Sequence, residues 1–140
     1  IELTRKNARL NNLDNVSFEC ANVFEMLTSL YESKTSVYDY IILDPPAFTK
    51  SSSCVHNAER GYKEINMKAM KLLPRGGYLA TCSCSHFMTD ELFKKMLRSA
   101  AADAGVSLRQ IEARQQSPDH PILWSVPETD YLKFYIFQVV

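Results

Sequence analysis

The sequence has no net charge and no long apolar run. Sixteen basic residues balance sixteen acidic ones, which excludes a global field that attracts nucleic acid but leaves open a local patch or a companion domain. No apolar run reaches the ~18 residues that span a membrane. The N-terminal "IELTRKNARLNNL" is polar and amphipathic and shows no signal-peptide pattern. We therefore expect no membrane segment.

Cysteines are few and show no metal-binding spacing. The four of them stand at positions 20, 54, 82 and 84, with no CxxC pair and no paired-histidine spacing. This pattern argues against a disulfide framework and against a zinc site. We expect no metal, and reduced thiols in a cytoplasmic protein.

The 140 residues are enough for one domain, and 46% of them are hydrophobic, which is typical of a globular chain. Apolar spacing and turn residues alternate along it and predict helices and strands in turn. We expect helices at 1–13, 22–31, 56–73 and 89–104, and strands at 16–20, 38–43, 78–82, 106–113 and 133–140.

This alternation predicts an α/β fold with a mostly parallel sheet and helices on both faces. The last two strands have no helix between them, so we expect one of them to run antiparallel at the sheet edge. The predicted chain starts on a helix. We therefore expect residues 1–140 to be part of a larger domain, truncated at its N-terminus.

The stretch "IILDPPAF" at 41–48 ends a buried strand with an acid, two prolines and an aromatic residue. Ligands of open α/β sheets bind at the carboxyl ends of strands, where Asp44 stands. Pro45 and Pro46 stiffen the backbone that follows, and Phe48 offers a flat face on which a base could stack. Taken alone, the stretch is equally well explained as a turn that stops a strand.

Several motifs taken together are more specific. "LDPPAF" resembles motif IV of class I S-adenosylmethionine-dependent methyltransferases. "RGYKEIN" (60–66), "LLPRGGYLATCSCS" (72–85), "DHP" (119–121) and "PETDYLK" (127–133) follow in the order and spacing of one family. Over essentially its whole length the chain resembles the PUA-domain-containing methyltransferases that modify carbon 5 of cytosine in large-subunit ribosomal RNA.

The resemblance implies a Rossmann-like methyltransferase sheet, S-adenosyl-L-methionine as the methyl donor, and ribosomal RNA of the large subunit as the partner. It places Asp44, Pro45 and Pro46 beside the donor, and Asn22 where the family commonly has an Asp that contacts adenine. Family members often carry Lys after the two prolines, and this chain has Ala47. The glycines, at 61, 76, 77 and 105, form no GxGxG loop, so we expect the first two strands and the Gly-rich donor loop to be absent from this chain.

Methylation at carbon 5 requires a thiolate that adds to carbon 6 of the cytosine, because carbon 5 is not nucleophilic in the resting ring. "TCSCS" at 81–85 follows the neighbouring predicted strand and offers two thiols. The family pattern Thr-x-Ser-Cys-Ser implies that Cys84 is the nucleophile, with Cys82 as the alternative. Asp44 is a candidate for the base that removes the carbon-5 proton or for the group that holds the cytosine amine. Both roles stay open.

Four further residues are candidate substrate contacts beside Phe48. Arg60, Tyr62 and Lys63 start the helix after the motif loop and can reach RNA phosphates, although a solvated helix face with Tyr62 packed inward explains them equally well. His120 is a candidate for the target-base pocket or a structural histidine. Two other functions remain as alternatives, an amino methyltransferase that needs no cysteine and a non-catalytic α/β module that forms a homodimer.

Overall fold

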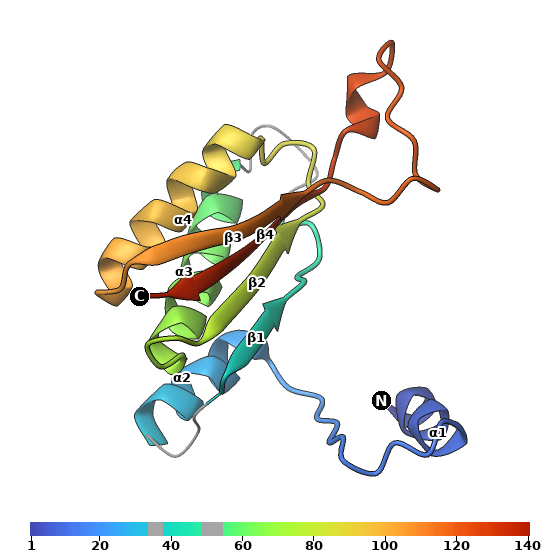
Figure 1. The fold of residues 1–140 in the computed structure, drawn as a ribbon, viewed down its shortest axis with the longest axis vertical. Coiled ribbons are helices and arrows are strands. Elements are labelled where there is room, and N and C mark those ends of the chain that lie inside the picture. The colour runs from blue at the N-terminus through green and yellow to red at the C-terminus, as the bar shows by residue number, and fades with distance from the viewer. Residues whose placement is uncertain (34–37, 49–54) are drawn as a thin grey trace.

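A computed structural model of the chain describes residues 1–33, 38–48 and 55–140. Helices and strands alternate through most of it, as the sequence predicts (Figure 1). In chain order they are α1 (Glu2–Leu10), α2 (Val23–Ser33), β1 (Tyr40–Leu43), α3 (Val55–Leu72), β2 (Tyr78–Ser83), α4 (Asp90–Ala104), β3 (Leu108–Arg114), a short 3-10 helix (Pro127–Thr129) and β4 (Lys133–Val139).

The four strands form one sheet in the order β1-β2-β4-β3. β1 and β2 are parallel, while β4 runs antiparallel to both β2 and β3. Three strands therefore point the same way, and the fold class is confirmed as α/β. The reversed strand differs in place from the prediction, because β4 lies between β2 and β3 and not at the sheet edge. β4 can lie inside the sheet because the long β3–β4 connection lets it return between its neighbours.

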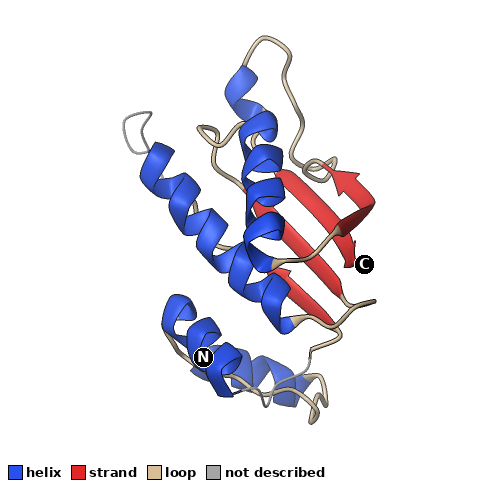
Figure 2. Cartoon of the chain, turned by 90° about the vertical axis from the view of Figure 1, so that its left-hand side faces the viewer, coloured by secondary structure: helices blue, strands red, loops and turns tan. Residues whose placement is uncertain are grey.

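Helices α3 and α4 pack side by side on one face of the sheet (Figure 2). The core lies in this layer and includes Phe93, Met96 and Leu97 of α4, each 2% exposed or less. Burial of a side chain of this size stabilises the fold by about 1.5–3 kcal/mol. Helix α4 begins where predicted, since the Thr89 side chain accepts a hydrogen bond from the Leu92 amide, and it ends at Gly105 in the left-handed conformation (φ 72°).

The predicted strand at 16–20 is wrong. Residues 16–20 lie in the connection that leads from α1 toward α2 (Figure 1), and no described strand pairs with them. A strand needs a neighbour for its backbone hydrogen bonds, and alternating side chains alone do not supply one. Helix α1 also ends earlier than predicted, at Leu10, because Asn12 turns the chain with a φ of 53°.

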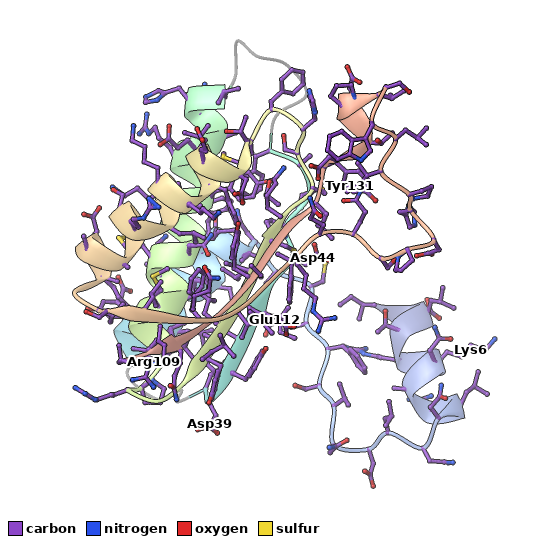
Figure 3. All side chains as sticks on the ribbon, turned by 45° about the horizontal axis from the view of Figure 1, so that its top comes forward. Lys6, Asp39, Asp44, Arg109, Glu112 and Tyr131 are labelled. Atoms are coloured by element: carbon purple, nitrogen blue, oxygen red, sulfur yellow. The ribbon has the colours of Figure 1, made fainter. Side chains whose placement is uncertain are left out.

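The parallel strands direct their carboxyl ends to one edge of the molecule. In Figure 3, Asp44 and Tyr131 lie near this end of the sheet, whereas Asp39 and Arg109 lie at the other. The loop between β3 and β4 therefore stands at the same end as the "DPPAF" motif. Among the helices described, none is both long and apolar enough to cross a membrane.

Candidate active site

Asp44 and Cys82 come together at the carboxyl ends of β1 and β2. The parallel register pairs Leu43 with Thr81, so the residues that follow each of them become neighbours. Cys82 Sγ lies 3.1 Å from Asp44 Oδ1 and 3.4 Å from the Leu43 carbonyl oxygen. Asp44 itself is exposed. The sequence-based expectation that the two motifs meet is confirmed for this pair.

Burial and this contact together favour the thiol form of Cys82. Burial raises the pKa of Cys82 to about 12, and the hydrogen bond to Asp44 and the carboxylate charge act in the same direction. The side chain is 7% exposed. A protonated, buried thiol is a poor nucleophile, because the thiolate is the reactive form.

Cys84 has the opposite surroundings. Strand β2 ends at Ser83, so Cys84 follows the strand and is exposed, while the serines on either side of it are 0% and 2% exposed. The Ser85 amide donates to Ser83 Oγ at 3.3 Å, which closes a turn around Cys84. Of the thiols that the structure describes near Asp44, Cys84 is thus the accessible one. Cys20 is exposed on the connection between α1 and α2, and Cys54 lies outside the described residues.

Tyr62 of α3 connects the "DPPAF" and "TCSCS" motifs from within the core. It is fully buried, its hydroxyl accepts a hydrogen bond from Ser83 Oγ at 3.0 Å, and the same hydroxyl bonds to the Phe48 backbone. The Phe48 ring packs against the Tyr62 ring at a centroid distance of 4.6 Å. At position 61 a Cβ would lie 3.2 Å from Phe48 Cδ2, so glycine there permits the close approach. Burial raises the pKa of Tyr62, and the bonds from Ser83 and Phe48 oppose this effect.

The other predicted substrate contacts are dispersed. Arg60 is exposed, Lys63 forms an ion pair with Asp103 of α4 at 2.7 Å, and Phe48 is half-buried. His120 is exposed in the β3–β4 loop, with Nδ1 3.4 Å from the Tyr131 hydroxyl. Tyr62 is packed inward and presents no surface to a ligand. The structure therefore places Tyr62 and Phe48 together beside the Asp44 motif, whereas Lys63 contacts Asp103 and His120 contacts Tyr131.

Asn22 lies at the start of α2 and is exposed. Its side-chain oxygen accepts a hydrogen bond from the Phe24 amide at 3.0 Å, so it caps the helix. Its amide nitrogen lies 3.4 Å from Glu25 Oε1. Both polar ends of this side chain are engaged, so a ligand must replace at least one of these bonds to bind Asn22.

Lys133, the last residue of the "PETDYLK" motif, lies beside the Cys84 turn, and the sequence predicted no role for it. It is 8% exposed, and Nζ donates to the carbonyl oxygens of Ser85 at 2.6 Å and Tyr131 at 2.7 Å. Burial lowers the pKa of Lys133, while the charges of Asp130, Cys84 and Asp90 oppose this shift. The sequence did hold a sign that Lys133 is buried: in the alternating strand "KFYIFQV" it stands on the same face as the buried tyrosine, phenylalanine and valine.

A cavity of about 580 Å³ opens beside Lys133 at the same end of the sheet. Its walls come from the start of α4, the end of β3, the start of β4 and the loop between these strands. The lining includes His86, Asp90, Arg114, Asp130, Lys133 and Tyr135. Hydrogen-bond donors and acceptors both face this space, as in a site for a polar ligand. Within the described part of the chain, no cluster of His, Cys, Asp and Glu could hold a metal ion.

Comparison with known proteins agrees with this geometry. A family model described as a methyltransferase domain matches residues 1–126. The chain belongs to this methyltransferase family. Ribosomal RNA large subunit methyltransferase I of Shigella dysenteriae serotype 1 (strain Sd197) is 41% identical over 142 residues, which cover 100% of this chain and 35% of that protein. The Escherichia coli O157:H7 (strain EC4115 / EHEC) protein of the same name is also 41% identical, with 36% of its length covered. The chain thus spans about a third of these curated relatives.

Solved structures share the fold. The methyltransferase SMU.776, complexed with SAH, superposes with a TM-score of 0.81 at 20% identity, over 99% of this chain and 36% of that one. TrmN from Thermus thermophilus gives a TM-score of 0.61 at 20% identity, over 99% of this chain and 33% of that one. At such low identity these neighbours establish the Rossmann-like methyltransferase fold alone.

Proposed function

We propose that the protein containing this chain transfers a methyl group from S-adenosylmethionine to carbon 5 of a cytosine in large-subunit ribosomal RNA. The observation that carries the proposal is the pair of thiols at the end of β2. Cys82 is buried and protonated against Asp44, whereas Cys84 is exposed two residues further along. The names of the 41% identical relatives support ribosomal RNA as the substrate class.

In this proposal the Cys84 thiolate forms a bond to carbon 6 of the cytosine, and the electron pair moves toward carbon 5, which becomes nucleophilic. S-adenosylmethionine supplies the methyl group when bound. Asp44, exposed at the end of β1, then either accepts the carbon-5 proton or holds the cytosine amine. Loss of that proton to the base re-forms the 5–6 double bond, breaks the carbon–sulfur bond and returns the Cys84 thiolate.

The residues present fit one wall of a donor site. Asp44 offers an exposed carboxylate that can accept hydrogen bonds from the donor, and Pro45 and Pro46 shape the backbone beside it. Asn22 fits less well, because its side chain already caps α2. We propose that the Gly-rich loop and two further strands of the domain belong to sequence outside this chain, since the relatives are much longer.

The test is the replacement of each cysteine by alanine in the full-length protein. Cys84→Ala should abolish transfer of labelled methyl groups to large-subunit RNA, whereas Cys82→Ala should lower it only in part, through loss of the bond to Asp44. Methyl transfer that survives Cys84→Ala would defeat the proposal. Such a result, with the label on an exocyclic amine, would favour the amino methyltransferase alternative, in which Asp44 binds that amine.

A homodimer remains a prediction with one supporting surface. Tyr40 and Ile42 of the edge strand β1 are 46% and 68% exposed, which is unusual for such side chains on a sheet. Sizing of the 140-residue chain together with its Ile42→Lys variant tests this surface. Equal elution of both as monomers would contradict the dimer.

A further inference from the structure

The turn that carries Cys84 is bonded on both sides. Ser83 and Ser85 are buried while Cys84 between them is exposed. The bond from the Ser85 amide to Ser83 Oγ closes the turn. An exposed residue between two buried neighbours has its backbone fixed without using its own side chain. Ser83 and Ser85 therefore determine where the Cys84 thiol lies.

The first contact comes from α3. Ser83 Oγ lies 3.0 Å from the Tyr62 hydroxyl, and Tyr62 also bonds to the Phe48 backbone. Rings of Phe48 and Phe93 pack on Tyr62 at 4.6 and 5.9 Å between centroids, so its position is set by packing. One buried hydroxyl thus fixes the Cys84 turn relative to the loop that carries Asp44.

The second contact comes from β4. Lys133 stands opposite Ser83 in the antiparallel register, and its ammonium group donates to the Ser85 carbonyl at 2.6 Å. Burial of an ammonium group is unfavourable, and a neutral donor would satisfy a carbonyl equally well. A buried cation beside the turn is explained if its positive charge also acts on the exposed Cys84 sulfur, with which Lys133 interacts electrostatically. The nearby Asp130 and Asp90 carboxylates limit this charge, since both act on Lys133.

We propose that Tyr62 and Lys133 are positioning residues for Cys84, which hold the turn at 83–85 from two sides so that the sulfur meets carbon 6 of the base. This inference rests on the proposed function, in which Cys84 is the nucleophile. Neither residue touches the substrate in this role. Tyr62 acts through Ser83, and Lys133 acts through the Ser85 carbonyl and its charge.

The experiment compares Tyr62→Phe, Lys133→Met and Lys133→Arg in the full-length protein. Tyr62→Phe keeps the ring and loses only the hydroxyl, and Lys133→Met keeps the chain length and loses the charge. Tyr78→Phe is the matched control, because its hydroxyl bonds to Gln138 at the opposite end of β2. Lys71→Met is the second control, since Lys71 lies over the Tyr31 ring, away from the turn.

Two readouts are measured. We expect kcat for RNA methylation to fall about 10- to 100-fold in Tyr62→Phe and Lys133→Met, with the KM for RNA within about twofold of wild type. Lys133→Arg should recover part of the loss, and both controls should match wild type. The second readout is independent of activity: the Ser85 amide should exchange its hydrogen for deuterium faster in the same two variants than in wild type.

Unchanged kcat in both variants, or a rise in KM alone, would overturn the inference even where Ser85 exchange is faster. If Lys133→Met fails to fold, Lys133→Arg and Tyr62→Phe still decide the matter through the same two readouts. Failure of the proposed function gives a different result, namely methylation that survives Cys84→Ala. The two failures are therefore distinguishable.

Discussion

The two thiols of "TCSCS" should differ sharply in their reaction with iodoacetamide. Alkylation consumes the thiolate, and Cys82 is held as a thiol by burial and by Asp44. A rise in its pKa from 9.0 to about 12 lowers the thiolate population near neutral pH by about 1000-fold. Burial adds a steric barrier to the same reagent. Cys84 is exposed and serves as the reference.

The assay is a time course at pH 7.5 on the folded protein, read by fragment-ion mass spectrometry of the peptide that contains both cysteines. We expect Cys84 to be labelled at least about 100-fold faster than Cys82. Asp44→Asn provides a graded perturbation, because it removes the carboxylate charge that helps to raise the pKa of Cys82. Labelling of Cys82 should then accelerate yet stay slower than that of Cys84, since burial is the largest cause of the shift.

Comparable labelling of the two cysteines in the folded protein would refute the reasoning. If Cys82 is alkylated as fast in buffer as in urea, the contact between Cys82 and Asp44 does not form in solution. An unchanged Cys82 rate in Asp44→Asn would show that the carboxylate has no effect on the thiol. The exposed Cys20 gives an internal reference for reagent strength.

Three further predictions concern stability. Gly61→Ala should lack the gain of about 1 kcal/mol that alanine brings to a helix, because its Cβ would meet Phe48 at 3.2 Å, and a full gain in thermal melting would contradict this. Thr89→Ala should lower the unfolding free energy in urea by about 1 kcal/mol through loss of the cap on Leu92, with Thr89→Ser near wild type as the control. The pKa of Cys82 is raised from 9.0 to about 12, so the stabilisation that depends on its proton is fully present below pH 9 and is lost as the pH rises toward about 12. The free energy of unfolding in urea should therefore fall between these pH values, and it should fall less steeply in Cys82→Ala.

Local signals predicted much of the fold. Helix α4 lies where Thr89 and Gly105 mark its ends, and β2 lies where the apolar run "YLATCS" predicts a buried strand. These features depend on residues close in sequence. The segment 16–20 failed because a strand also needs a paired neighbour, which alternation cannot reveal. The position of β4 inside the sheet likewise depends on tertiary pairing.

The site was predictable only in part, for the same reason. Asp44 and Cys82 could be placed together because the ends of parallel strands meet at one sheet edge. The bonds from Ser83 to Tyr62 and from Lys133 to Ser85 join residues 21 and 48 positions apart. No spacing rule connects residues so distant, and a lysine at the start of a strand is ordinarily taken as exposed. These contacts could be found only from coordinates.

The environments of the two thiols also bear on why this motif holds both of them. Cys82 lies in β2 beside the end of β1, and its thiol donates to the Asp44 carboxylate. That bond holds Asp44 Oδ1 at the carboxyl ends of β1 and β2, and Cys84 follows Cys82 two residues later. A small apolar residue at position 82 would fill the space but leave Asp44 free to rotate. The buried thiol therefore contributes to the site as a hydrogen-bond donor, and identical residues two positions apart have different roles because one faces the core and the other faces solvent.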